Sequence, residues 1–394
     1  MPIKRTLAAA RPALAAFAAM GVGWGCYAAV LPDIKAMLGV DERQLGLMIF
    51  CTPIAAMGAM LLAPVIGARL GRVAMPVSAG TMALAFALPG NTSSLVLFPL
   101  AMMVCGATTG LADVIMNTRV SALENERDLH LMNLCHAAYS FGYAGAAIVT
   151  GLLRGAGWGP GAVMPALAFA ALVLALAAWE RDGTIHGLRK PKDGSAGRLG
   201  LLPLVGGGIV FIAFLTENAV ENWSALHIEK TLGGSPTEGA FGPAILALTM
   251  GMARIIGQGF AARTDPVKLL SGGALISATG ALTAAWAAGP VVAYAGLIVM
   301  GVGSSVIAPT AYSMVGRRAR PEARARAVAR TTLFGYFGYF FGPPMLGLIA
   351  GAFGLRFAFV FTAGVLVVVM ALAPLLVRTG SAGGLSGQKK SESK

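Results

Sequence analysis

Five ionisable side chains stand inside stretches of the chain that are otherwise apolar: Asp113, His136, Glu217, Glu221 and Arg254. A charge at the centre of a bilayer costs at least about 2.5–3.5 kcal/mol, so each residue is a candidate for binding or proton transfer if its stretch spans a membrane. Carboxylates and imidazoles take up and release protons, whereas a guanidinium pairs with carboxylates. These residues therefore predict a polar site within the membrane.

Asp113 is the centre of the first group. Asn117 lies one turn further along the same helix face, and His136 reaches the depth of Asn117 on the next, antiparallel helix. We interpret these residues as a network that binds substrate or moves protons. The alternative is that Asn117 and His136 only hold two helices together by hydrogen bonds.

Glu217 and Glu221 form the second group and are also one helical turn apart. We expect Glu217 to lie desolvated in the outer third of its helix, where it could load protons from outside. For both carboxylates, an exposed helix end is the alternative. Asn222 and Trp223 follow directly, and Trp223 is either a stacking platform for a ligand or part of an interfacial aromatic belt.

Arg254 is the one basic residue deep within an apolar stretch. It lies about eight residues, or about 12 Å, from the inner end of its helix, which matches the depth of Asp113. We therefore predict a gate in which Asp113 and Arg254 pair, directly or through His136 or water, when the inner side is closed. Alternatively, Arg254 extends to the cytoplasm and only anchors its helix.

The predicted site divides into three sets by role. Proton coupling is assigned to Glu217, Asp113 and Glu221, and the gate to Asp113 and Arg254. A third set would bind a small, polar and largely neutral solute through hydrogen bonds and ring faces, with packing as the alternative. It comprises Trp24, Tyr27, Asn117, His136, Asn222, Trp223, Ser305, Tyr312 and Tyr336.

Several kinds of chemistry have no matching motif. The sequence contains no phosphate-binding loop, dinucleotide fingerprint, nucleophile elbow or metal-ligand spacing. The four cysteines stand singly within apolar stretches, which offers neither a disulfide framework nor a zinc site. We expect no cofactor, no metal and no enzymatic activity.

Long uncharged runs must position these residues. Of 394 residues, 56% are hydrophobic and 12% are charged, about half the charged share of a soluble domain. A crossing helix needs about 20 apolar residues, and turn residues divide the two longest runs. We predict an all-α integral membrane protein with twelve helices, in the runs 12–32, 44–68, 73–112 (two helices), 131–153, 155–179, 199–216, 239–262, 269–316 (two helices), 331–355 and 357–377.

The distribution of basic residues predicts the orientation. Lys and Arg number 24 on the side of the N-terminus, five on the opposite side and one within a span. Because cytoplasmic loops carry the excess, we expect both termini in the cytoplasm and a multi-pass protein of the inner (plasma) membrane. The net charge of +13 then reflects topology and lipid contact, not nucleic-acid binding. The first apolar stretch is interpreted as an uncleaved helix.

A shift of 194 residues aligns the two halves of the chain. Residues 33–39 lie over 227–233 and 67–69 over 261–263, while 141–143 match 337–339 at an offset of 196. Such duplication is typical of alternating-access carriers, whose substrate binds between the halves. The expected division is 1–180 for an N-terminal six-helix bundle, 181–198 for a cytoplasmic linker, 199–377 for a C-terminal bundle and 378–394 for a disordered tail.

Three segments carry a family resemblance. Residues 68–72, Ala-Arg-Leu-Gly-Arg, stand where a loop signature G-x-x-x-D-R-x-G-R is expected, with Ala68 in place of its aspartate; the others are Gly106-x3-Gly110-x2-Asp113-x3-Asn117 and Glu217-x3-Glu221-Asn222-Trp223. Over residues 11–377 the sequence resembles the major facilitator superfamily (MFS), in its MosC- and YbjJ-like branch, distantly related to fucose permeases. The resemblance implies two pseudo-symmetric six-helix bundles and a sugar- or cyclitol-like solute.

The resulting hypothesis is a monomeric secondary transporter of a small molecule, driven by an ion gradient, most simply of protons. A proton-driven exporter of amphipathic compounds on the same fold is the first alternative, and ligands that compete in order of lipophilicity would favour it. A membrane sensor or scaffold without transport activity is the second. Binding without counterflow would favour the sensor.

Overall fold

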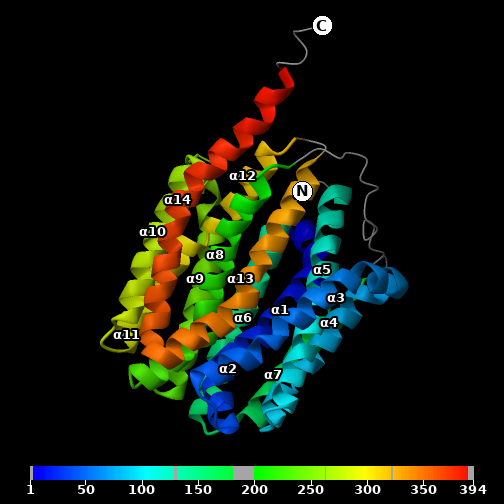
Figure 1. Ribbon diagram of the computed structural model, residues 1–394. Helices are drawn as coiled ribbons and strands as arrows, with labels where there is room; N and C mark the ends of the chain where they lie inside the picture. The colour runs from blue at the N-terminus through cyan, green and yellow to red at the C-terminus, as the bar shows by residue number, and fades with distance from the viewer. Residues whose placement is uncertain (1–2, 128–130, 181–198, 262, 321–322, 389–394) are drawn as a thin grey trace.

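Helices account for nearly all of the structure. The computed structural model describes residues 3–127, 131–180, 199–261, 263–320 and 323–388. Apolar runs favour helices because each helix bonds its own backbone polar groups, which a bilayer cannot do. The helices run side by side in one bundle (Figure 1) and are α1 (Ile3–Leu38), α2 (Glu42–Ile49), α3 (Cys51–Leu70), α4 (Ala74–Ala85), α5 (Leu97–Arg127), α6 (Met132–Gly155), α7 (Pro160–Leu176), α8 (Leu202–Leu226), α9 (Pro236–Ala261), α10 (Pro266–Ala285), α11 (Pro290–Ser304), α12 (Ile307–Arg318), α13 (Arg324–Phe353) and α14 (Leu355–Gln388).

The described residues accommodate the twelve predicted passes. Two passes consist of two helices each, because α2 continues into α3 at Phe50 and α11 into α12 after a break at Ser305. Within the described residues, nine stretches are long and apolar enough to cross a membrane, and one of them, Glu42–Asn91, covers two passes. α6 and the shorter α7 complete the set.

α1 begins and α14 ends at the same end of the bundle (Figure 1), which we call the termini end; the opposite end is the far end. The predicted linker, 181–198, lies outside the described residues. α14 continues to Gln388, so residues 378–388 of the predicted tail are helical. α8 continues past Thr216 to Leu226. The helix thus extends beyond the uncharged run 199–216 and carries Glu217 and Glu221, as expected, and Glu217 is bonded to neighbouring helices.

Glycines at equivalent places agree with the internal duplication. Gly39 follows α1 with φ +66°, and Gly233, 194 residues later, has φ +72°; glycine adopts this conformation without a steric penalty. A Cβ on Gly142 would collide with the backbone of α1, and one on Gly338 with the backbone of α8. α6 therefore packs on α1 as α13 packs on α8.

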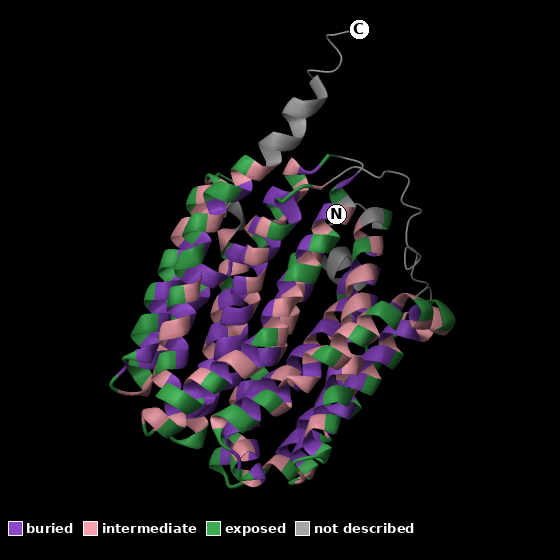
Figure 2. Ribbon diagram, viewed as in Figure 1, coloured by how far each residue is buried: buried purple, intermediate pink, exposed green. Residues whose placement is uncertain are grey.

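Exposed residues lie mostly on the outer surface of the bundle, whereas buried residues face its interior (Figure 2). Many of the exposed residues are large and apolar. Leu61 on α3 is 81% exposed and Ile256 on α9 is 75% exposed, as suits contact with acyl chains. One core lies mainly among α1–α7 and another among α8–α14. Trp223 of α8 is an exception, because it is fully buried in the core of the first half.

α5, which carries Asp113, packs closely on α3. Cβ atoms on Gly106 and Gly110 would overlap the carbonyl oxygens of Thr52 and Ala56. Small residues four apart allow this kind of backbone contact between membrane helices. The glycines seen in the sequence motif therefore fix the position of α5, and with it that of Asp113.

Candidate functional site

A cavity of about 500 Å³ lies between the two halves of the bundle. It is lined by α1, α2, α3, α5 and α6 of the first half and by α8, α9, α12 and α13 of the second. Toward the termini end the lining reaches Met132, the first residue of α6. Toward the far end it stops at Ala28 of α1 and Tyr143 of α6, before these helices end. The cavity therefore extends toward the termini end.

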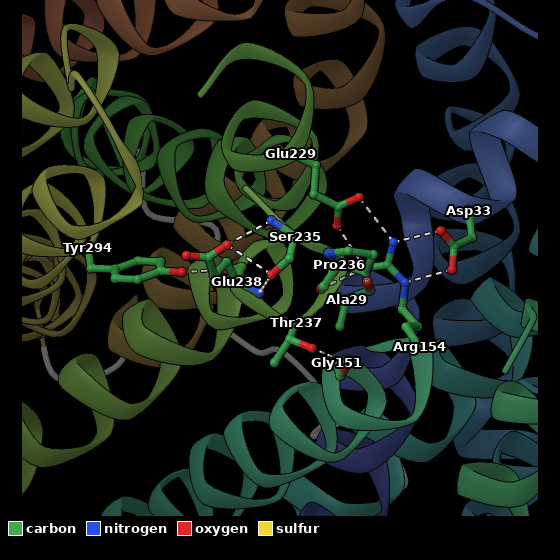
Figure 3. Close-up of polar contacts among 10 residues, drawn as sticks. All are labelled: Ala29, Asp33, Gly151, Arg154, Glu229, Ser235, Pro236, Thr237, Glu238 and Tyr294. Carbon is green, nitrogen blue, oxygen red and sulfur yellow. Dashed lines mark hydrogen bonds and ion pairs between the residues drawn. The ribbon is translucent and has the colours of Figure 1, made fainter. Parts of the chain in front are cut away.

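Beyond the last lining residues, Arg154 joins the two halves (Figure 3). Its Nε and Nη2 each donate to the Asp33 carboxylate of α1 at 2.6 Å, and its Nη1 donates to Glu229 Oε1, after α8, at 2.8 Å. Nη1 also donates to the carbonyl oxygens of Ala29 at 2.7 Å and Pro236 at 3.1 Å. We call Arg154, Asp33 and Glu229 the far-end ion cluster.

Burial makes the far-end ion cluster costly to open. The Arg154 side chain is 1% exposed and that of Glu229 is 8% exposed. A buried charge that loses its partner costs about 3–5 kcal/mol. The Thr237 hydroxyl of α9 adds a hydrogen bond of 3.0 Å to the Gly151 carbonyl of α6, also between the halves (Figure 3). The far end is therefore closed in this structure.

The sequence did not reveal the far-end ion cluster. Arg154 falls between the predicted runs 131–153 and 155–179, whereas α6 extends to Gly155 and includes it. In the sequence, an arginine that pairs with distant carboxylates cannot be distinguished from an arginine that only anchors the end of its helix. Its two carboxylate partners lie 121 and 75 positions away, beyond the reach of helical spacing.

Asp113 lies in the cavity wall, and each of its carboxylate oxygens has a donor. Asn117 Nδ2, from the same helix, donates to Oδ1 at 2.9 Å, as the helical spacing predicted. The Tyr336 hydroxyl of α13 donates to Oδ2 at 2.9 Å. This second bond connects the halves. Asn117 itself does not line the cavity and reaches it only through Asp113.

Arg254 contacts Glu217 and not Asp113. Its Nη2 lies 3.3 Å from Glu217 Oε1, and the Tyr339 hydroxyl donates to Oε2 at 3.0 Å. Among the described residues no ion pair joins Asp113 to Arg254, so the predicted gate pair is absent from this conformation, whose far end is closed. Glu217, expected apart in the outer third of its helix, instead shares the cavity wall with Arg254.

Most of the other predicted residues also reach the cavity. Those that line it are Trp24, Tyr27, His136, Glu221, Asn222, Tyr312 and Tyr336. Trp223 and Ser305 do not. Trp223 packs against Gly347 between the halves and is fully buried, so the structure places it neither as a platform in the cavity nor in an interfacial belt. The Ser305 hydroxyl donates to the Val302 carbonyl at 2.7 Å, where α11 breaks.

Several polar lining residues were not singled out from the sequence. They are Thr52, Thr109, Tyr139, Tyr143 and Asn218. Tyr143 stands within one of the duplicated segments, whose other copy contains Tyr339, and this equivalence was a usable signal. The remaining four carry no such signal, because isolated hydroxyl and amide groups also serve as contacts between membrane helices.

The comparisons with known sequences agree with this architecture. The profile of the Major Facilitator Superfamily matches residues 206–393. An uncharacterized MFS-type transporter of Yersinia pestis is 31% identical over 372 residues, which cover 92% of this chain and 94% of that protein. The membrane protein MosC of Rhizobium meliloti is 24% identical over 358 residues, or 89% of this chain and 85% of MosC.

The chain belongs to the major facilitator superfamily. It is a multi-pass secondary transporter of this superfamily and not an enzyme. A bacterial homologue of the human lysosomal transporter Spinster, solved in an inward-facing and unoccupied conformation, has a TM-score of 0.73 at 16% identity, with 97% of this chain and 99% of that chain covered. The Escherichia coli fucose:proton symporter FucP has a TM-score of 0.59 at 17% identity, with 93% and 97% covered. Both share the fold.

Proposed function

We propose that this transporter couples the movement of a small polar solute to protons, with Glu217 and Asp113 as the coupling carboxylates. One observation carries the proposal: Tyr339 and Tyr336 of α13 each donate a hydrogen bond to one of these carboxylates in the wall of the cavity. A hydrogen bond to a carboxylate weakens when the carboxylate is protonated. Proton occupancy therefore changes how α13 is held. FucP, which shares the fold, is a fucose:proton symporter.

The termini end is placed in the cytoplasm because most of the basic residues lie in segments at that end. In this orientation the far-end ion cluster closes the outer side, and the cavity extends toward the cytoplasm. The structure then corresponds to the inward-facing conformation of an alternating-access cycle. Its opposite conformation requires Arg154 to part from Glu229.

The cavity favours a solute with little or no negative charge. Its carboxylates, Asp113, Glu217 and Glu221, outnumber its one arginine, which opposes multiply anionic substrates. A volume of about 500 Å³ lies within the usual range for ligand pockets, about 300–1,000 Å³. The tyrosine and tryptophan rings in its wall offer apolar faces with polar edges. Sugars and cyclitols have matching surfaces.

The test uses the purified full chain in proteoliposomes, with D-xylose, L-fucose and myo-inositol as labelled probes under an imposed proton gradient. Glu217→Gln keeps the shape of the side chain and an acceptor for Tyr339 but cannot carry a proton. We expect it to abolish gradient-driven accumulation while exchange of labelled for unlabelled solute survives.

Glu238→Gln is the matched control. Glu238 accepts from the Ser235 hydroxyl at 2.8 Å at the start of α9, outside the cavity, and the variant should accumulate solute as the wild type does. Accumulation at the wild-type level by Glu217→Gln would remove Glu217 from the coupling mechanism.

A proton-driven exporter of amphipathic compounds is the second candidate. Met20, Met57, Met60 and Met132 line the cavity, and flexible thioether side chains adapt to varied apolar ligands. A graded series of alkylamines would distinguish the two functions by thermal shift. Stabilisation that rises with lipophilicity, without any stabilisation by the three polyol probes, would favour the exporter.

A further inference from the structure

Three buried polar groups at the closed end of the cavity have no hydrogen-bond partner. They are the hydroxyls of Tyr27 on α1 and Tyr143 on α6 and the indole N–H of Trp223 on α8, and no described residue bonds to them. The tyrosine rings line the cavity, but the two hydroxyl oxygens and the indole nitrogen have almost no accessible surface. The packing thus leaves no space for a water molecule against them. We call Tyr27, Tyr143 and Trp223 the unpaired polar layer.

The unpaired polar layer lies where the two halves of the bundle meet. Trp223 belongs to the second half but is fully buried in the core of the first. Tyr143 is followed on α6 by Ala144, which is buried in one apolar cluster with Ala240 of α9. Tyr27 and Tyr143 are within electrostatic range of each other. Separation of the halves at the far end therefore exposes these three side chains to water.

Burial of these three groups without partners raises the free energy of the conformation with a closed far end. Nearly all buried polar groups in folded proteins are bonded, because an unbonded group has lost its hydrogen bonds to water and gained none in return. When the far end opens, water can bond to all three groups. The unpaired polar layer therefore favours opening, whereas the far-end ion cluster favours closure.

We infer that the unpaired polar layer is a release device, which opposes the far-end ion cluster and keeps the closed and open far ends close in free energy. A transporter visits both conformations in every cycle, and a ligand shifts their populations only by its differential affinity for them. A far end held by a buried ion cluster without any opposing contribution would open rarely. The unpaired polar layer supplies that contribution within the protein, so the inference needs neither a proton nor a particular solute.

Removal of one hydroxyl tests the release device, in the purified full chain without solute and without a proton gradient. Tyr27→Phe and Tyr143→Phe keep the ring and remove only the unbonded group. Opening of the far end is read from the rate at which a maleimide labels Ala29→Cys in a variant without the four native cysteines, because Ala29 is fully buried beside Arg154. We expect each phenylalanine variant to be labelled about fivefold more slowly than this parent, the ratio that corresponds to the lower end of the cost of an unpartnered buried group.

The melting temperature is the second measurement. Tyr27→Phe and Tyr143→Phe should melt no lower than the parent protein, because neither change removes a hydrogen bond. Tyr294→Phe is the matched control, because the Tyr294 hydroxyl donates to the Glu238 carbonyl at 2.7 Å within the second half. This control should melt at a lower temperature, and its rate of labelling at Ala29→Cys should equal that of the parent.

Unchanged or faster labelling of either Tyr27→Phe or Tyr143→Phe would overturn the inference, because the hydroxyl would then not disfavour the closed far end. A fall in melting temperature like that of Tyr294→Phe would overturn it as well, since it would show that the hydroxyl has a partner. The proposed proton coupling fails by a different result: accumulation at the wild-type level by Glu217→Gln contradicts the coupling role and leaves these labelling rates unaffected.

Discussion

Asp113 and Glu217 are held by different kinds of partner. Asp113 accepts from an amide and a phenol, both neutral, whereas Glu217 accepts from a phenol and also faces the guanidinium of Arg254. Removing Arg254 therefore leaves the charge of Glu217 unbalanced inside the bundle. Removing Asn117 leaves Asp113 with its bond to Tyr336.

The ion pair of Arg254 with Glu217 predicts a non-additive effect on stability. Arg254→Gln should destabilise the protein more than the double variant with Glu217→Gln, because an unpaired buried carboxylate costs more than a neutral pair. Their side chains are 26% and 13% exposed, so we expect a coupling of about 0.5–3 kcal/mol. Denaturation of the four proteins in one detergent measures it. Additive losses would mean that the pair does not contribute.

The gate of Asp113 with Arg254 stays a prediction for the conformation with a closed termini end. Transport rates of Asp113→Asn, Arg254→Gln and the double variant should be non-additive if the two residues pair during the cycle. Accessibility of an introduced cysteine at the termini end should rise in both single variants. Strictly additive losses, with unchanged accessibility, would exclude the gate.

At the scale of helices, contacts through glycine decide where the polar residues lie. A Cβ on Gly110 of α5 would overlap the carbonyl oxygen of Ala56 on α3. Asp113 is three residues further along α5, less than one turn away. A change in the distance between these helices therefore moves a carboxylate in the cavity wall.

Gly110→Leu should destabilise the protein by about 1–3 kcal/mol, the usual cost of overpacking, and should also lower transport. Gly58→Leu is the matched control, because a Cβ on Gly58 of α3 has no heavy atom within 4 Å. Thermal unfolding in detergent compares the two variants. Equal melting temperatures would show that α3 can move away from α5 without cost.

The sequence predicted features that depend on local spacing. The twelve passes follow from the length of apolar runs, the contact of Asn117 with Asp113 from one helical turn, and the duplication from equivalent segments. The bonds of Arg154 to Glu229 and of Tyr336 to Asp113 were not predicted, because they join residues 75 and 223 positions apart. Such contacts depend on how the two halves dock. No periodicity within one helix contains that information.

At the scale of the whole molecule, the far end has several independent contacts between the halves. Besides the far-end ion cluster, a Cβ on Gly46 of α2 would collide with the Pro343 carbonyl of α13, and one on Gly151 of α6 with Ala240 of α9. The cavity opens away from these contacts. The far end must therefore lose an ion cluster and close backbone packing together when the halves part there.

Arg154→Gln should shift the protein toward conformations with an open far end, because it leaves the carboxylates of Asp33 and Glu229 facing each other. Labelling of Ala29→Cys by an impermeant maleimide, in a variant without the four native cysteines, should increase. Arg356→Gln is the control at the same end, because Arg356 donates to the carbonyls of Ala285 and Ala287 within the second half. Equal labelling of the Arg154 variant and the control would contradict a closing role for Arg154.

α13 carries Tyr336 and Tyr339 three residues apart, and these side chains bond carboxylates of different halves. A rigid helix cannot move one hydroxyl without moving the other, so the proposed coupling predicts that solute and proton act on this one shared element. Thermodynamic reciprocity then applies: the factor by which a bound proton changes solute affinity equals the factor by which bound solute changes proton affinity. Addition of solute to the protein in weak buffer should therefore exchange protons with the solution. The number exchanged per solute should equal the slope of the logarithm of solute affinity against pH.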